Sequence, residues 1–167
     1  MKMGYQTLFW GDIFVHPPLH GELFEIVSSL TQKRHCIGAT PADPSFNQPP
    51  PGIPSLWCDW IPSKEGDRLR IRGKRPYRYV EWLTLLADKI LFPHGRRLHG
   101  MISWQGEHSE DKGLITALGS KIVVDGSVTQ TGANPFVEEY LGWELETVAA
   151  LGGILHDRVI DQLEQIK

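Results

Sequence analysis

Apolar side chains recur with two different periods along this chain, and together the periods predict a mixed α+β fold. Residues 5–15 are rich in aromatic and β-branched types, which favour a half-buried strand. From Leu19 to Leu30 the apolar residues recur every three or four positions, which predicts a helix with one apolar face. A second helix is expected over residues 77–91, which Pro76 opens and which carries an apolar stripe of its own.

Five further strands are expected between and after these helices. They cover residues 55–61, 67–72, 97–105, 114–118 and 121–124. The first two flank a short turn and predict a hairpin, and the third alternates between apolar and polar side chains as a strand with one buried face does. The last two surround Gly119-Ser120, and a glycine at the first turn position favours a tight type II′ hairpin.

The order strand, helix, strand, strand, helix, strand is that of a ferredoxin-like split βαβ (βαββαβ) sheet, here with an added β-hairpin and a C-terminal helix. Right-handed crossovers would place both long helices on the same face of that sheet. We expect one α+β domain over residues 1–167. Residues 39–54 hold six of the twelve prolines and predict a loop. Residues 127–167 are expected to form a C-terminal extension that ends in a helix.

Charge and composition narrow the class of protein only a little. A net charge of −3 and a pI of about 6.1 argue against a surface that binds nucleic acid or anionic lipid as a whole. Cys36 and Cys58 are too few for a disulfide framework, so we expect two buried or half-buried thiols in a reducing compartment. No stretch has the length and apolarity of a membrane span, and the N-terminal residues lack the pattern of a signal peptide, which favours a cytoplasmic protein.

Basic residues are concentrated in one short segment. Residues 68–78 contain six Lys or Arg and no acid, which leaves eleven bases and 20 acids, a net charge of −9, in the rest of the chain. The candidate binding residues of this segment are Arg68, Arg70, Arg72, Lys74 and Arg75. Alternation along a strand places the first three on one face.

In a ferredoxin-like sheet this basic strand would lie beside the first strand. If Ile13 and Val15 face the core, Trp10 and Phe14 share the outer face with the arginines. Arginine beside exposed aromatic rings is how RNA-recognition sheets hold single-stranded bases. The alternative is that the acidic, partly apolar tail 134–167 folds back over this face, burying the rings and pairing with the arginines.

Gln105 and Glu107 are the other candidate residues, with a histidine and acids nearby at 108–111. A cluster of histidine and carboxylates can perform acid–base chemistry or bind a metal. The plainer interpretation is a strand that bends at Gly106 and whose acids solvate a turn. No nucleophile motif, phosphate-binding glycine loop or metal-ligand spacing stands out, so we expect no catalytic residue, metal or cofactor.

The most distinctive stretch of sequence is residues 97–125, together with residues 76–95 before it. It contains W-L, P-x-G, L-x-G-x-[IV]-x-[WY]-Q-G-E and D-x-G-x-[IL], at Trp82-Leu83, Pro93, Gly95, Leu98, Gly100, Ile102, Trp104-Gln105-Gly106-Glu107, Asp111, Gly113 and Ile115. Gly11, Ile13 and Pro18-Leu19 match an opening G-x-I…P-x-L. This pattern resembles a group of small bacterial and phage proteins to which no activity is assigned. The resemblance implies a phage or prophage accessory protein.

These observations favour a non-enzymatic protein that binds another macromolecule, with a protein as the expected partner. An inhibitor of a host defence system, such as CRISPR, is one form of this hypothesis. A single-stranded nucleic-acid or nucleotide-binding domain that uses the basic and aromatic sheet face is the alternative. An enzyme that uses the region from Gln105 to Asp111 is the third hypothesis. The sequence pattern does not indicate an oligomeric state.

Overall fold

The structure, a computed structural model, describes residues 5–73, 76, 78–129 and 135–142. Its central feature is a seven-stranded antiparallel sheet with the strand order β2-β3-β1-β4-β5-β6-β7. The strands are β1 (Thr7–His16), β2 (Trp60–Pro62), β3 (Arg68–Ile71), β4 (Arg97–Gly106), β5 (Lys112–Gly119), β6 (Ile122–Val124) and β7 (Ser127–Val128). The expected α+β class is confirmed.

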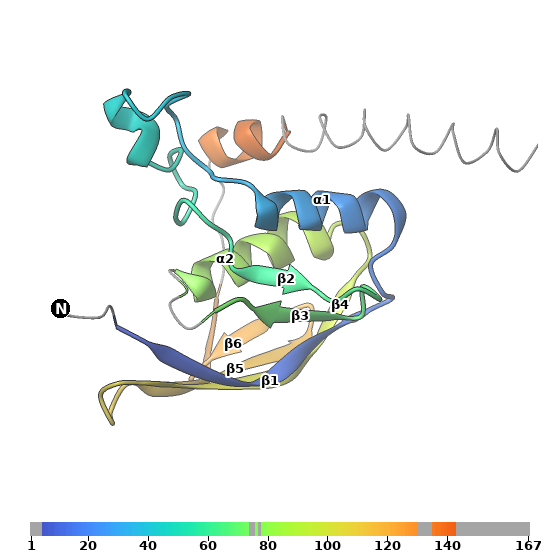
Figure 1. The fold of residues 1–167 in the computed structure, drawn as a ribbon. Helices are drawn as coiled ribbons and strands as arrows, with labels where there is room; N and C mark the ends of the chain where they lie inside the picture. The colour runs from blue at the N-terminus through green and yellow to red at the C-terminus, as the bar shows by residue number, and fades with distance from the viewer. Residues whose placement is uncertain (1–4, 74–75, 77, 130–134, 143–167) are drawn as a thin grey trace, which may run out of the picture.

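The helices of the described residues lie on one side of this sheet (Figure 1). They are α1 (Gly21–Gln32), α2 (Tyr79–Leu86) with a π-helical continuation η2 (Ala87–Leu91), and a short 3-10 helix η1 (Pro44–Asn47). Residues 135–142 are also helical and lie near α1. We call the opposite side of the sheet, turned away from α1 and α2, the outer face.

The two long helices connect strands that are not neighbours. Helix α1 leads from β1 to β2 with β3 between them, and α2 leads from β3 to β4 with β1 between them. The expected hairpin of β5 and β6 is present, and Gly119 has a φ of +71° in its turn. Strand β7 adds one strand that the sequence pattern did not predict. The ferredoxin-like assignment of the first six elements stays a prediction.

Strands β1 and β4 pair along ten residues and form the centre of the sheet. Gly11 and Gly100 have φ values of +109° and +126°, a region that side-chain-bearing residues rarely adopt. A Cβ at Gly11 would overlap the carbonyl oxygen of Met101, and a Cβ at Gly100 would overlap that of Asp12. The two glycines therefore allow the strands to approach and twist closely.

The core lies between the sheet and the helices and contains two buried tryptophans. The indole N–H of Trp82 donates to Ser55 Oγ at 2.7 Å, and that of Trp60 donates to the carbonyl of Tyr79 at 2.7 Å. Both rings are fully buried, so each polar N–H has the acceptor that burial requires. Other fully buried side chains come from the sheet and from both helices: Ile13, Leu30, Leu69, Leu83, Leu86, Ile90 and Leu98.

The first expected strand of the 55–61 and 67–72 hairpin begins later than predicted. Strand β2 starts at Trp60, so residues 55–59 are not part of the sheet. The carbonyl of Leu56 accepts instead from the amide of His35 at 2.7 Å. Leu56 therefore bonds to a loop, and pairing toward β3 begins only at Asp59, whose carbonyl accepts from the amide of Arg72 at 2.7 Å. The second strand, β3, and its pairing with β2 agree with the prediction.

The helix expected over 77–91 changes its hydrogen-bond pattern near its end. After Leu86 the chain follows a π-helical turn, and the amide of Phe92 donates to the carbonyl of Ala87 at 2.9 Å. A spacing of five residues replaces the usual spacing of four. The apolar periodicity of the sequence does not distinguish an α-helical from a π-helical turn here, because consecutive residues, Ile90 and Leu91, are both apolar and both buried.

Candidate functional site

Side chains on β1 alternate between the core and the outer face. Ile13 and Val15 are buried, whereas Trp10 is 54% exposed and Phe14 is 46% exposed. Strand β3 lies beside β1, and Phe14 pairs directly with Arg68. The structure therefore places Trp10 and Phe14 on the same face as Arg68 and Arg70, with Phe14 next to Arg68.

Apolar side chains continue across the outer face onto β4 and β5. Met101 on β4 is 57% exposed and sits next to Thr116 on β5, while His99 pairs with Leu118. Alternation and pairing place the exposed apolar residues of these strands and of β7 on the same side: Leu8, Trp10, Phe14, Met101, Leu114, Leu118 and Val128. Contiguous exposed apolar side chains mark an interaction surface more often than a solvated one.

The outer face also carries positive charge in a chain that is negative overall. Outward-facing positions of the described strands hold four Arg or Lys and one acid, although the net charge of the chain is −3. The acid is Asp12, and the four bases are Arg68, Arg70, Arg97 and Lys112. This face is therefore complementary to a negatively charged partner.

Asp12 lies between two of these arginines. Its Oδ1 accepts from Arg70 Nε at 3.0 Å, and its Oδ2 is 3.8 Å from Arg68 Nη1. These exposed pairs contribute only about 0–1 kcal/mol each. The Arg70 side chain is 57% exposed, and its two terminal nitrogens have no partner among the described residues. A guanidinium whose two terminal NH2 groups face solvent can bind a carboxylate or a phosphate.

Arg72 does not share the outer face, so that part of the prediction is wrong. Strand β3 ends at Ile71, and the Arg72 side chain turns toward the helix side of the sheet. Its Nη2 donates to the carbonyl of Thr31 in α1 at 3.1 Å and lies 3.5 Å from Asp59 Oδ1. Alternation applies only as far as the strand extends. Lys74 and Arg75 lie outside the described residues.

Gln105 and Glu107 help to shape the loop between β4 and β5. Gln105 Nε2 donates to the carbonyls of Gly106 and His108, both at 3.0 Å. Glu107 Oε1 accepts from the backbone amide of Gln6 at 2.9 Å. These contacts fix the loop onto β4 and the chain before β1, so the geometry favours a structural role for both side chains.

Asp111 is the centre of the same loop. One carboxylate oxygen accepts from the Tyr5 hydroxyl, and the other accepts from the Trp104 indole at 3.4 Å. The hydrogen bond to Asp111 raises the pKa of Tyr5 above its ordinary value. The hydroxyl of Tyr5 also accepts from the amide of His108 at 3.2 Å. The Asp111 carboxylate is therefore held by donors from the segment before β1 and from β4.

A shallow hollow lies on the outer face beside Trp10. It has a volume of about 510 Å³ and combines apolar walls with polar groups of the β4–β5 hairpin. The lining residues are Trp10, Ser103, Trp104, Gln105, Lys112, Gly113, Leu114 and Asp125. The carboxylate of Asp125 is engaged by the backbone amide of Leu114 at 3.0 Å. Lys112 has no partner among the described residues and stands at the margin of the hollow.

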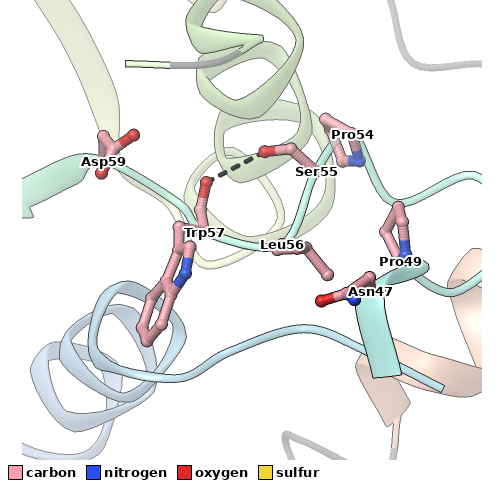
Figure 2. A pocket seen from close by; sticks show the side chains of 7 residues that line it. All are labelled: Asn47, Pro49, Pro54, Ser55, Leu56, Trp57 and Asp59. Atoms are coloured by element: carbon pink, nitrogen blue, oxygen red, sulfur yellow. Dashed lines mark hydrogen bonds between the residues drawn. The ribbon is translucent and has the colours of Figure 1, made fainter. Parts of the chain in front are cut away.

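A second pocket, of about 470 Å³, opens between the proline-rich loop and the segment before β2 (Figure 2). Its lining residues are Asn47, Pro49, Pro54, Ser55, Leu56, Trp57 and Asp59. The sequence did not indicate this pocket, because it forms only when the loop 39–54 folds against the chain that follows it. Prolines and an exposed tryptophan ring give it apolar walls.

The polar groups of this second pocket are engaged within the protein. The Ser55 hydroxyl donates to the carbonyl of Trp57 at 3.0 Å, as Figure 2 shows, and it also accepts from a buried indole. Asn47 Oδ1 accepts from Arg34 Nη2 at 2.7 Å. Asp59 lies against Arg72. The pocket therefore offers a ligand mainly apolar contact, and the outer face is the stronger candidate site.

The described part of the C-terminal extension does not cover the outer face. Val137 and Leu141 are buried, and the Tyr140 hydroxyl bonds to His35 Nδ1 on the helix side of the sheet. Lys89 Nζ is 2.6 Å from Glu138 Oε1. For residues 135–142 the expected cover over Trp10 and Phe14 is therefore wrong, because these residues have their own apolar partners elsewhere. The tail helix expected near the end of the chain lies outside the described residues.

Within residues 5–73, 76, 78–129 and 135–142, no three His, Cys, Asp or Glu side chains come together as metal ligands would. In the same residues, no helix has the length and apolarity to cross a membrane.

Sequence reasoning missed several members of the outer face, although the signal was present. Met101, Leu114 and Leu118 are exposed, and the adjacent positions along β4 and β5 are buried, at Ile102, Ile115 and Ala117. The same alternation that identified Trp10 would have found them. Comparison with known proteins gives no further guide, because no family model, curated protein or solved structure significantly matches this chain.

Proposed function

We propose that this protein is a non-enzymatic binding protein that attaches to another protein through its outer face. The observation that supports this most is the exposure of Trp10, Phe14 and Met101 on one face of the sheet, where Met101 pairs with Asp12 and lies diagonally to both rings. Removing apolar surface from water contributes about 25 cal/mol per Å². A partner that covers these side chains removes their apolar surface from water, and this burial favours binding.

The resemblance of residues 82–115 to bacterial and phage proteins extends this proposal. On this proposal the chain is an accessory protein of phage or prophage type that occupies a surface on a host protein, for example as an inhibitor of a defence system such as CRISPR. The hydrogen bonds that tie Gln105, Glu107 and Asp111 into the hairpin loop support a binding role over an enzymatic one.

We also propose that the first six elements form a ferredoxin-like unit. The strand order β2-β3-β1-β4 and the two interleaved helical crossovers support this assignment. In such a unit the face without helices is free for binding. The β5–β6 hairpin and β7 widen that face beyond four strands.

The test compares partner capture by three versions of the whole chain. A double variant, Trp10→Ser with Met101→Ser, removes two large apolar groups from the outer face. The control, Ile37→Ser, removes a side chain that is similarly exposed, 55%, in the loop that follows α1. After capture from a bacterial lysate and quantitative mass spectrometry, the double variant should lose specific partners that the control retains. Equal capture by all three would contradict the proposal.

A single-stranded nucleic-acid binder remains the second candidate because of one row across the sheet. In this row Arg68 on β3, Phe14 on β1 and His99 on β4 are neighbours. A base can stack on the ring while arginine contacts its phosphate. This candidate predicts that a fluorescent oligonucleotide binds at low salt and that Arg68→Ala with Arg70→Ala weakens it. Absence of binding at low salt would exclude it.

A further inference from the structure

We propose that the partner presents an acidic segment with apolar side chains, which lies diagonally across β3, β1, β4 and β5. This inference rests on the proposed function and names the chemistry of its partner. The partner's carboxylates would meet Arg70 at one end and Lys112 at the other. An apolar side chain would fill the hollow between Trp10 and Leu114.

The charges of the face support an acidic partner. Arg70 uses one guanidinium nitrogen on Asp12 at 3.0 Å and presents its remaining N–H groups to solvent. Lys112 stands at the margin of the hollow, on the strand next to β4. Three strand spacings and four residues along β5 separate these two positions, which corresponds to roughly 20 Å. A partner helix of about 14 residues covers that distance.

The apolar side chains favour a protein over a nucleic acid. Most of those exposed on the outer face are aliphatic or thioether side chains, as at Leu8, Met101, Leu114 and Leu118. Bases stack on planar aromatic rings. Aliphatic side chains are buried most favourably against other apolar side chains, which a protein partner supplies.

The same charges argue against a second copy of this chain as the occupant. Two outer faces brought together would place Arg68, Arg70, Arg97 and Lys112 of one copy against the same set in the other. Each face contributes only Asp12 among its outward strand positions to offset them. Like charges across an interface suppress association.

The experiment uses two synthetic helical peptides of about 18 residues with one leucine stripe each. One carries glutamate at its polar positions and the other carries lysine. Nuclear magnetic resonance follows the indole N–H of Trp10 in the full chain, assigned with Trp10→Phe. The glutamate peptide should shift this signal, and the lysine peptide should bind at least about tenfold more weakly, the change expected for one lost charge-assisted contact.

Charge reversal provides the matched variant. Arg70→Glu with Lys112→Glu changes only exposed side chains and should reverse the preference, so that the lysine peptide binds more tightly. Equal binding of both peptides to the unaltered chain would overturn the inference. Two other results would overturn it as well: a shift of Trp10 by polythymidine alone, or a dimer in sedimentation that Trp10→Ser with Met101→Ser dissociates.

The two levels of the proposal fail in different ways. If neither peptide shifts Trp10 while partner capture still requires Trp10 and Met101, the acidic chemistry is wrong and the protein-binding function stands. If capture does not depend on these side chains, the proposed function is wrong whatever the peptides do.

Discussion

Replacing Gly11 with alanine perturbs the pairing of the two longest strands. The φ of +109° at this position costs a residue with a side chain about 1–3 kcal/mol. The new Cβ would also overlap the carbonyl oxygen of Met101, so β4 must move away. Loss of one or two hydrogen bonds of the β1–β4 ladder adds about 1 kcal/mol each. The expected total is about 2–5 kcal/mol.

The control for this prediction is Gly126→Ala. Gly126 has a φ of +88°, and a Cβ there meets no atom within 4 Å, so only the backbone strain of about 1–3 kcal/mol applies. Urea unfolding of both variants, followed by tryptophan fluorescence, gives the two free energies of unfolding. Gly11→Ala should be the less stable by about 1–2 kcal/mol, the hydrogen bonds lost between β1 and β4. Equal losses would refute the reasoning that close strand approach requires glycine at this position.

Three further predictions concern single groups. Burial raises the pKa of the Cys58 thiol to about 12, so an alkylating reagent at neutral pH should label Cys36, which is partly exposed, well before Cys58 in the folded protein; equal labelling would contradict the packing. Burial also raises the pKa of Tyr79 from 10.0 to about 12, so the unfolded chain loses this proton first. The stability contributed by Tyr79 is therefore complete below pH 10.0 and is lost as the pH rises toward about 12. In urea unfolding at alkaline pH, the free energy of unfolding of Tyr79→Phe should fall less over this range than that of the unaltered chain. Ser55→Ala leaves the buried indole of Trp82 without its acceptor and should cost about 1–3 kcal/mol in urea unfolding; an unchanged midpoint would show that the bond contributes nothing.

Local sequence patterns predicted the fold class, the buried faces of the strands and one hairpin turn. A strand with one buried face alternates with a period of two, which is why the faces of β1 and β4 follow from residues such as Ile13 and Ile102. The hairpin turn at Gly119 depends on one backbone angle that glycine adopts easily. The class of fold and the aromatic side of β1 were therefore accessible from the sequence.

Other features depend on contacts between distant residues, and the sequence does not reveal these. Residues 55–59 have strand-like composition, but Leu56 bonds to His35 instead of to a strand. The alternation of β3, extended by one residue, would place Arg72 on the outer face. The strand ends before it, and its guanidinium donates instead to the carbonyl of Thr31. The hydrogen bond from Gln105 Nε2 to the carbonyl of His108 likewise depends on how the β4–β5 loop folds back, which the sequence pattern does not show.

The extent of the outer face is also a non-local property. Trp10 and Phe14 were identified from β1 alone, but their neighbours on β4 and β5 depend on register. Strand order decides whether these side chains form one surface or several separate ones. The position of residues 135–142 on the helix side depends on Tyr140 and His35, which are far apart in the sequence.

Photocrosslinking from the outer face tests the central claim most directly. A photoreactive amino acid replaces Met101 in one version of the full chain and Ile37 in another, both at exposed positions. After irradiation in bacterial cells, the version labelled at position 101 should form a discrete adduct with a protein, and the version labelled at position 37 should not. An adduct from position 37 alone, or none from position 101, would contradict the assignment of the outer face as the binding surface.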